Sequence, residues 1–435
     1  MRNKGISVLL CAGLMTGTVM VSGPSAAAAD DFRERLESIP GMTVTSVEDD
    51  KGHPLYKLTY AQPVDHGHPE AGTFTQRLTL WHKATDKPTV LFTSGYGLNY
   101  DTNTLTDILD ANQVSVEHRY FKESRPTGAA KDDWSKLTVQ QEAADEHRIT
   151  RALRAVEKGK WIGLGASKGG QTATFHERYY PDDLDGVVAV VAPNDANNKD
   201  DSAYERFFKT VGTRACRDAL GAVQREMLVR RDALLPTFEA DAKAEGYSFE
   251  KGLGTADRAY EYAVLELVWG FWQSHTEADC ATVPDAKKAT DDELYAWSMK
   301  YGMYVEHDDD AEGNPYNRQA ATQLGWADLK FKHLDDLLRY PGLRQPNSLL
   351  PAALRADHDG RTVADVDRWV RTEGERMMFI YAGNDPWSSE RFTPSAHDSY
   401  RYVAPGANHT AAIEKLPPAQ LAEAVTTVKR WADVK

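Results

Sequence analysis

The chain has 435 residues with a formal net charge of −14, and 41% of the residues are hydrophobic. This hydrophobic fraction is ample for a buried core, and the length suits one large domain with an insertion, or two domains. The acidic balance excludes nucleic acid as an expected partner, because a phosphate backbone repels a negatively charged surface.

The first residues have the pattern of an export signal. Arg2 and Lys4 precede an apolar stretch over residues 6–21, and residues 27–29 fit an A-x-A cleavage site. The apolar stretch is short for a membrane span, and the residue before Cys11 is not the small one expected in a lipoprotein. We therefore expect a signal peptide over residues 1–29 and a secreted, extracellular protein without a membrane anchor.

The next part of the chain is expected to begin with an N-terminal extension that lasts to about Gly52. Polar and apolar residues then alternate, imperfectly, over 56–60 and 74–80, as in half-buried strands. The turn-rich stretch 63–72 lies between them and predicts a hairpin.

Five later segments are more continuously apolar, which is typical of parallel strands covered on both faces. They span residues 89–93, 114–116, 161–164, 187–191 and 377–381. Helical patterns separate several of them, and the pattern over 138–156 opens with a capping box formed by Thr138 and Gln141. Strands that alternate with helices predict the α/β class and a parallel sheet.

Residues 194–372 differ from this alternation. They contain few strand-like runs, and helix-forming residues dominate over 215–235, 255–272 and 320–338. We expect a mainly helical cap domain over 194–372, inserted between two strands of a sheet domain that comprises 30–193 and 373–435.

Removal of the signal leaves two cysteines, Cys216 and Cys280, and both lie in the expected cap. Cysteines of exported proteins usually pair because their compartment is oxidising, so we expect a disulfide between these two. The alternative is a pair of buried free thiols.

The pentapeptide Gly165-Ala166-Ser167-Lys168-Gly169 has the form G-x-S-x-G. An apolar strand precedes it and a helix-like segment, 170–180, follows it, which is the context of a nucleophile elbow. Small residues two positions before and after the serine prevent clashes in the strained turn. The motif predicts an α/β-hydrolase fold with Ser167 as the nucleophile; the alternative is an ordinary glycine-rich turn.

A serine nucleophile needs a base that is oriented by an acid, and in this fold the chain order is serine, acid, histidine. Asp385 follows an apolar strand, where sites of α/β folds lie. His409 lies in a loop before the expected C-terminal helix, 417–434. We expect Asp385 and His409 to complete the triad; the alternatives are a helix N-cap for Asp385 and a surface histidine for His409.

Two backbone N–H groups are expected to bind the oxyanion. One belongs to Lys168, the residue after the nucleophile, and the other to Tyr96 in the glycine-rich segment 94–97. The alternative for that segment is a plain turn.

No metal and no cofactor are expected. The acidic run 306–312 begins like a calcium loop, but the twelfth position is Gln319 instead of glutamate. Zinc spacings, an H-E-x-x-H motif and a P-loop are also missing from the sequence.

Several segments together resemble one family, the secreted actinobacterial prolyl tripeptidyl and tetrapeptidyl aminopeptidases. They are Gln62-Pro63-Val64-Asp65-His66, Gly72-Thr73-Phe74-Thr75-Gln76-Arg77, Glu117-His118-Arg119-Tyr120-Phe121 and Ser124-Arg125-Pro126. The E-H-R-Y segment is similar also to that of the lysosomal prolyl carboxypeptidase group. That group is rich in cysteine, and this chain is not, so details of the cap do not transfer from it.

The resemblance implies an exopeptidase that releases tri- or tetrapeptides after proline from a free N-terminus. Such selection requires a carboxylate for the amine, and Glu205 and Glu306 are candidates, although each also fits a solvated surface acid. Trp387 is a candidate wall of a proline pocket, and core packing explains it equally well.

Two other functions remain open from the sequence. One is a secreted esterase or lipase of the same fold, which uses the same triad. The other is a binding protein on an inactive hydrolase scaffold, and the complete order of the triad argues against it.

Overall fold

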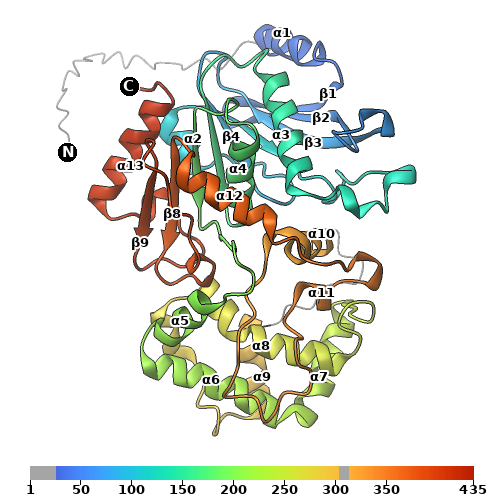
Figure 1. The fold of residues 1–435 in the computed structure, drawn as a ribbon, viewed down its shortest axis with the longest axis vertical. Coiled ribbons are helices and arrows are strands. Elements are labelled where there is room, and N and C mark those ends of the chain that lie inside the picture. The colour runs from blue at the N-terminus through green and yellow to red at the C-terminus, as the bar shows by residue number, and fades with distance from the viewer. Residues whose placement is uncertain (1–25, 303–312) are drawn as a thin grey trace, which may run out of the picture.

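The computed structural model describes residues 26–302 and 313–435, so most of the expected signal peptide lies outside the described residues. Within these ranges, the strands form one mixed sheet in the order β1-β2-β3-β5-β4-β6-β7-β8-β9 (Figure 1). Their bounds are β1 Met42–Asp50, β2 His53–Pro63, β3 Thr73–Trp81, β4 Thr89–Thr93, β5 Asn112–Val116, β6 Trp161–Ala166, β7 Gly186–Val190, β8 Met377–Ala382 and β9 Tyr400–Ala404.

The sheet is antiparallel from β1 through β3 to β5 and parallel from β5 to β9. Helices cover both of its faces, which explains the continuous apolar runs of the parallel strands. Val188 and Val190 of β7 pack toward α2 and α13, whereas Ala189 packs toward α3, α4 and α12. The predicted α/β-hydrolase fold is confirmed. These helices are α2 Thr104–Leu109, α3 Val139–Leu153, α4 Lys168–Tyr179, α12 Arg361–Thr372 and α13 Pro418–Trp431.

The expected N-terminal extension is wrong. Helix α1 (Ala26–Glu37) packs on the sheet, and β1 pairs with β2 in an antiparallel register, Met42 opposite Tyr60. The alternation of buried Met42 and Val44 with exposed residues is brief, and the second half of β1 is mostly exposed and charged. A strand at the edge of a sheet therefore has a weak periodic signal.

A second, helical body lies below the sheet in Figure 1. It has a core of its own, which includes Leu220, Met227, Tyr260 and Leu294. Its elements are α5 Ser202–Thr210, α6 Arg214–Val229, α7 Arg231–Ala244, α8 Ala256–Ser274, η4 Glu277–Thr282, α9 Asp291–Gly302 and α11 Pro346–Leu349. Three further elements, α10 Gly313–Gln319, η5 Ala320–Leu324 and η6 Ala352–Leu354, pack in the cores beside the sheet.

We propose that this body is the cap domain, with one change of boundary. Helix α12 belongs to the expected cap range, but its Val363 and Val366 pack with Phe379 of β8 in a core beside the sheet. The packing places the end of the cap before residue 361.

The helix expected over 320–338 is also wrong. The π-helical turn η5 ends at Leu324, and Gly325 follows with φ of 86°. Its backbone lies against Asp195, where a Cβ atom would be only 2.5 Å from the carboxylate. This close approach ends the helix, and the apolar residues that follow pack in turns.

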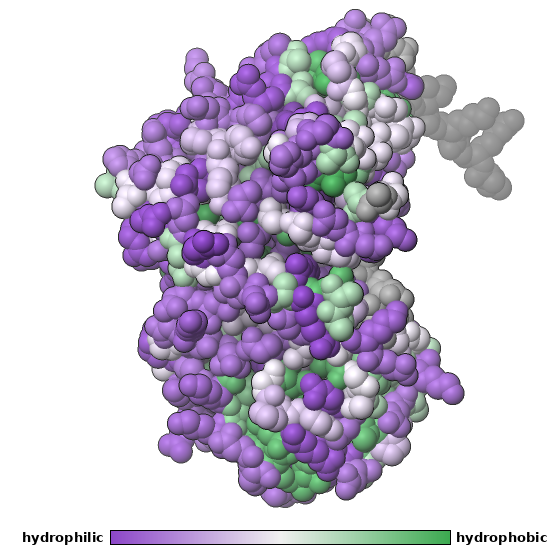
Figure 2. Space-filling view, turned by 45° about the vertical axis from the view of Figure 1, so that its right-hand side comes forward, coloured by the Kyte–Doolittle hydropathy of each residue, from purple (hydrophilic) through white to green (hydrophobic). Residues whose placement is uncertain are grey.

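The remaining short elements connect the sheet and its helices. They are the 3₁₀ turns η1 Pro69–Ala71, η2 Gly128–Ala130, η3 Trp134–Lys136, η7 Pro386–Ser388 and η8 Ile413–Lys415. The face in Figure 2 is mostly hydrophilic, with hydrophobic residues gathered at the lower end of the cap. Among the described residues, no helix is both long and apolar enough to span a membrane.

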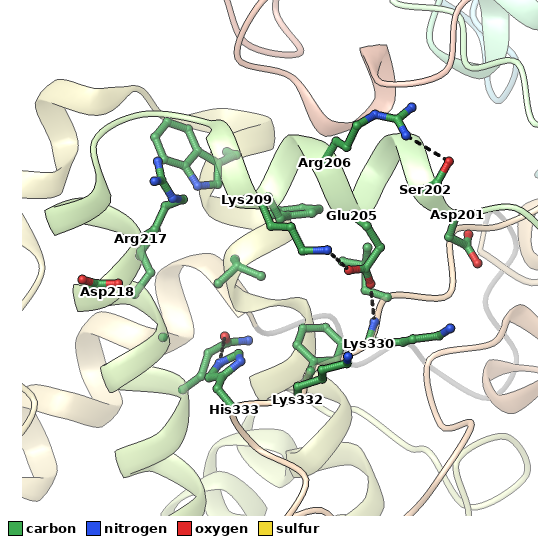
Figure 3. Close-up of a pocket in the computed structure, with 18 of the residues that line it drawn as sticks. Asp201, Ser202, Glu205, Arg206, Lys209, Arg217, Asp218, Lys330, Lys332 and His333 are labelled. Carbon is green, nitrogen blue, oxygen red and sulfur yellow. Dashed lines mark hydrogen bonds and ion pairs between the residues drawn. The ribbon is translucent and has the colours of Figure 1, made fainter.

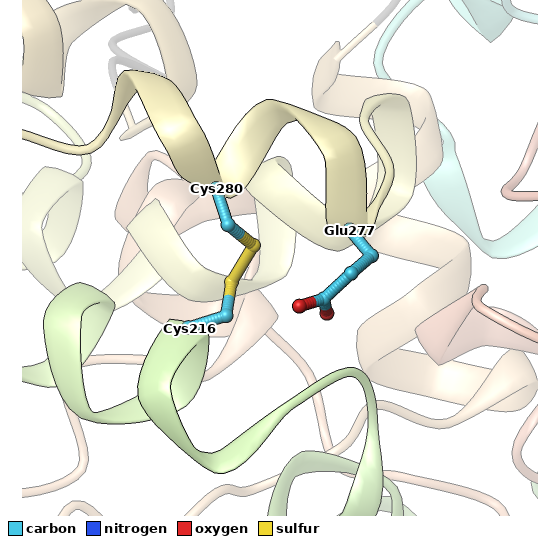
Figure 4. Close-up of side chains that lie close together, drawn as sticks. All are labelled: Cys216, Glu277 and Cys280. Carbon is cyan, nitrogen blue, oxygen red and sulfur yellow. A yellow bond between two sulfur atoms is a disulfide. The ribbon is translucent and has the colours of Figure 1, made fainter.

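Cys216 of α6 and Cys280 of η4 form a disulfide, with 5.5 Å between their Cα atoms, as the sequence predicts (Figure 4). The Glu277 carboxylate lies beside them. It accepts hydrogen bonds from the backbone N–H (2.8 Å) and the hydroxyl (2.7 Å) of Thr213. With the sulfurs joined and the carboxylate bonded to Thr213, we interpret this group as a link between α6 and η4.

Replacement of both Cys216 and Cys280 by serine is expected to destabilise the protein by about 2–4 kcal/mol, because the unfolded chain regains the freedom of the closed loop. Urea unfolding followed by circular dichroism measures this change. Wild-type protein in reductant is the matched control and should unfold like the double variant. Equal midpoints for the oxidised wild type and the double variant would contradict a stabilising link between α6 and η4.

Candidate active site

Ser167 stands in a strained turn between β6 and α4. Its φ and ψ angles are 55° and −128°, and it occupies the N-cap position of α4. A positive φ is costly for a residue with a Cβ atom and persists only where neighbouring structure enforces it. The Ser167 N–H donates to the carbonyl of Val190 in β7, 2.8 Å away, which ties the turn to the next strand. This is the geometry of a nucleophile elbow.

The glycines around Ser167 allow its turn to pack against β4. A Cβ atom at Gly165 would lie 2.1 Å from the Gly169 carbonyl oxygen, and one at Gly169 would lie 2.0 Å from the carbonyl oxygen of Thr93. Gly95, with φ of 84°, closely approaches Lys168 and Gly169 from the loop after β4. The chain therefore permits only glycine at these positions.

His409 and Asp385 meet at the carboxyl end of the sheet. Asp385 follows β8, is 1% exposed, and its Oδ2 lies 3.0 Å from His409 Nδ1. The Ser388 hydroxyl also donates to Oδ2, at 2.7 Å. A carboxylate only accepts, so Nδ1 of His409 carries the proton and Nε2 is left as the acceptor.

Ser167 follows β6, and the His409 loop follows β9, which pairs with β8 at the other end of this part of the sheet. Strand β7 pairs with both β6 and β8, so Ser167 and Asp385 leave the same edge two strands apart. The backbone N–H of His409 donates to the carbonyl of Gln273 at the end of α8, 3.0 Å away. The cap thus contacts the histidine loop directly.

The two expected oxyanion donors lie on adjoining backbone segments. Lys168 is the first residue of α4, where N–H groups lack partners within the helix. The Tyr96 N–H donates to the hydroxyl of Ser94, 3.0 Å away, and would have to share or release this bond to serve a ligand.

The E-H-R-Y segment follows β5 and is buried among charged partners. Glu117 accepts from Arg77 of β3 at 2.7 and 2.9 Å, and Arg119 donates two bonds of 2.7 Å to Asp145 of α3. Both pairs hold the start of the chain segment after β5 against the sheet and α3. Their geometry is bidentate, which fixes orientation as well as distance.

Aromatic side chains extend from His409 into the cap. The Trp387 ring lies 6.2 Å from His409, 4.8 Å from Trp269 and 5.5 Å from Trp326, between ring centroids. Its indole N–H donates to the side-chain oxygen of Gln273, at 2.7 Å. The structure therefore places Trp387 beside His409, between this residue and the aromatic side chains Trp269 and Trp326.

Glu205 lies elsewhere. It lines a groove of about 1060 Å³ on the cap whose lining contains none of the three triad candidates (Figure 3). Its carboxylate accepts from the backbone N–H of Lys330 at 2.9 Å and pairs with Lys209 at 3.1 Å. These bonds give Glu205 a local structural role. Glu306, the other expected amine ligand, lies outside the described residues.

Sequence reasoning missed three acidic residues between the sheet and the cap: Asp195, Asp201 and Glu390. Within the described residues, none of them forms an ion pair, and Oδ2 of the 6%-exposed Asp195 has no hydrogen-bond partner. Burial and the Asp201 carboxylate raise the pKa of Asp195 to about 7. Burial, Asp195 and Asp201 together raise the pKa of Glu390 to about 8.

Comparison with known proteins identifies the family of the chain. Residues 25–435 match the profile of the PS-10 peptidase S37 family. The chain is also 45% identical to the prolyl tri/tetrapeptidyl aminopeptidase of Streptomyces mobaraensis, over 99% of this chain and 92% of that protein. The chain belongs to the PS-10 peptidase S37 family. As a member of this family, it is a serine peptidase and its substrates are peptides.

A more distant relative agrees with the resemblance carried by the E-H-R-Y segment. The chain is 30% identical to the lysosomal Pro-X carboxypeptidase of Bos taurus over 26% of this chain and 24% of that one. Among solved structures, the proline iminopeptidase of Mycobacterium smegmatis aligns over 86% of this chain and 98% of its own, with a TM-score of 0.41 and 12% identity.

The close contact of the elbow with β4 predicts that Gly169→Ala destabilises this S37 peptidase by about 3 kcal/mol and removes most activity, because the methyl group displaces the backbone of β4. Gly360→Ala is the matched control, since a Cβ atom there makes only ordinary contacts. Thermal unfolding and peptide cleavage measure both effects. Equal stability of the two variants would show that the contact is not tight.

Proposed function

We propose that the protein is a secreted exopeptidase that releases tri- or tetrapeptides after proline from free N-termini, with Ser167, His409 and Asp385 as its triad. The observation that carries the proposal is the 3.0 Å bond between His409 and Asp385 at the sheet edge that also holds the strained Ser167. The name of the Streptomyces mobaraensis relative supports the choice of substrate.

In this proposal, the Ser167 hydroxyl oxygen attacks the carbonyl carbon of proline while Nε2 of His409 takes the proton. The N–H groups of Lys168 and Tyr96 bind the oxyanion. The peptide C–N bond then breaks, His409 returns the proton to the leaving amine, and an acyl-enzyme remains. Water, deprotonated by His409, releases the tri- or tetrapeptide and restores Ser167.

The aromatic group around Trp387 supports a pocket for proline. The Trp387 ring lies 6.2 Å from that of His409 and packs against Trp269 and Trp326, at 4.8 and 5.5 Å between ring centroids. A pyrrolidine ring has no N–H once it is acylated, so an apolar pocket accepts it without leaving a polar group unpaired.

Asp195 and Glu390 support recognition of a free amine. Asp195 lies against the backbone of Gly325, and the ring of the next residue, Trp326, lies 5.5 Å from that of Trp387. An extended residue spans roughly 3.4 Å, so the amine of a tripeptidyl unit lies about 7–10 Å from the bond that is cut. An ammonium group would form the ion pair that the buried Asp195 and the half-buried Glu390 do not make within the described residues.

Secretion is supported by the first residues and by the disulfide. The positive start, the apolar stretch 6–21 and the small residues 27–29 form the pattern of a signal peptide. The Cys216–Cys280 bond fits the oxidising compartment that such a signal implies.

The proposal predicts that Ser167→Ala lowers the turnover of a proline-ending tripeptide anilide with a free amine by at least about a thousandfold, because no acyl-enzyme can form. Mass spectrometry of products from a peptide library identifies the bond that is cut. Wild-type protein that cleaves a short acyl ester and leaves the anilide intact would instead favour the esterase. Full activity of Ser167→Ala would rule out the triad.

Neutralising Asp195 or Glu390 is expected to weaken the binding of peptides with a free N-terminal amine. Asp195→Asn and Glu390→Gln should each raise KM by about tenfold or more and leave kcat nearly unchanged, because a buried charge pair is lost. Both variants should fold at least as stably as wild type, since each removes a carboxylate whose charge is disfavoured by burial and by the neighbouring acid. Asp218→Asn, at an exposed site on α6, is the control and should behave as wild type.

The pH dependence of KM also tests whether Asp195 and Glu390 bind the amine of the substrate. The raised pKa values of Asp195 and Glu390, about 7 and about 8, mean that both groups lose their charge as the pH falls through this range. KM should therefore rise as the pH drops from 8 to about 6 and change much less in the Asp195→Asn/Glu390→Gln double variant. An identical pH profile for wild type and double variant would reject the two residues as amine ligands.

A further inference from the structure

The side chain of Lys168 is charged and yet buried beneath the elbow. It is 2% exposed, and its ammonium lies 3.6 Å from a carboxylate oxygen of Glu142 and 3.4 Å from Nδ1 of His118. An ammonium group is costly to bury unless it is paired. Burial lowers the pKa of Lys168, and the carboxylates of Glu142 and Glu146 oppose this effect.

Lys168, Glu142 and His118 form a buried cluster. Both residues that supply the expected oxyanion donors, Lys168 and Tyr96, contact it. Lys168 supplies one N–H itself, and its ammonium lies over the ring of Tyr96, 5.7 Å from the centroid. The backbone N–H of His118 donates to the carbonyl of Tyr96, 2.9 Å away, while its ring meets Lys168 and, at 3.2 Å, Glu142. His118 thus contacts the loop after β4 through its backbone and the elbow through its side chain.

The cluster is anchored in the helices behind the sheet. Glu142 and Glu146 lie on α3, one turn apart, and Glu146 also meets His176 of α4 at 3.3 Å. His176 donates to Asp183, 2.9 Å away. The contacts with Asp183 and Glu146 raise the pKa of His176 to about 9 despite its burial, which favours a charged ring beside these acids. Opposite charges therefore fix α3, α4 and the end of β5 together.

We propose that Lys168, Glu142 and His118 position the two donor N–H groups of the oxyanion hole, with the lysine side chain and the histidine as positioning residues. The proposal rests on the proposed function, because it requires Ser167 to form a tetrahedral intermediate. It assigns a role to His118 of the E-H-R-Y segment. It also gives a reason for a lysine at position 168, where the oxyanion hole itself uses only the backbone N–H. The cluster touches no substrate; it acts through the backbone of Lys168 and Tyr96.

The test compares a variant that removes both charges with wild type. Lys168→Met/Glu142→Gln leaves no uncompensated charge in the core, so it avoids the main cause of misfolding. Steady-state kinetics on a proline-ending tripeptide anilide should give a kcat lowered by about ten- to a hundredfold, with KM within about twofold, because misplaced donors weaken only the transition state. Glu177→Gln, at a buried site on the same helix outside the cluster, should retain the wild-type kcat.

The affinity for a tripeptide aldehyde with the sequence of the anilide substrate is a second measurement. A loss of stability alone would not change this affinity. Ser167 adds to the aldehyde carbon, and the resulting oxygen occupies the oxyanion hole. The double variant should bind this aldehyde more weakly by the same factor as its loss in kcat/KM, and the product tripeptide as tightly as wild type. Lys168→Arg, which retains the charge, should recover most of the lost kcat.

Wild-type kcat and aldehyde affinity in the double variant would overturn the proposal, and so would a rise in KM at constant kcat. Ser167→Ala separates this failure from that of the proposed function. An inactive Ser167→Ala beside an unaffected double variant rejects only the positioning role. An active Ser167→Ala rejects the triad and the positioning role together.

Discussion

The active site depends on how closely the backbone of the elbow packs against β4. Gly169 lies where a single methyl group would come within 2.0 Å of the Thr93 carbonyl, and a Cβ atom at Gly165 would meet Gly169 just as tightly. This contact leaves Ser167 no alternative to its positive φ, so the strain of the turn is held by the packing of two adjacent parallel strands. The same contact places Gly95 beside Lys168, which brings the two expected oxyanion donors together.

Burial of charge links this turn to the rest of the molecule. Below the elbow, Lys168 and Glu142 form a buried ion pair, 3.6 Å between the charged atoms, so their charges offset each other. Between sheet and cap, Asp195 and Glu390 form no ion pair within the described residues, and their raised pKa values mean that their charge destabilises the protein at neutral pH. Proteins retain such unfavourable arrangements mainly at functional sites. The contrast between the two clusters favours a positioning role for the first and ligand binding for the second.

The sequence predicts the centre of the fold better than its periphery. Strands β4, β6, β7 and β8 have continuous apolar runs because helices cover both faces, and the order Ser167, Asp385, His409 follows from the fold once the elbow is found. The exposed edge strand β1 and the π-helical turn before Gly325 depend on tertiary contacts that leave no periodic signal. Likewise, an acid such as Glu205 cannot be told from Asp195 in sequence, because only packing decides which one is paired.

The most direct test of a triad centred on Ser167 is covalent labelling with a fluorophosphonate, followed by peptide mapping with mass spectrometry. We predict one adduct per chain, located on Ser167, and loss of peptidase activity in proportion to labelling. An adduct on a different residue, or an unlabelled protein that still cleaves peptides, would contradict the assignment of Ser167 as the nucleophile.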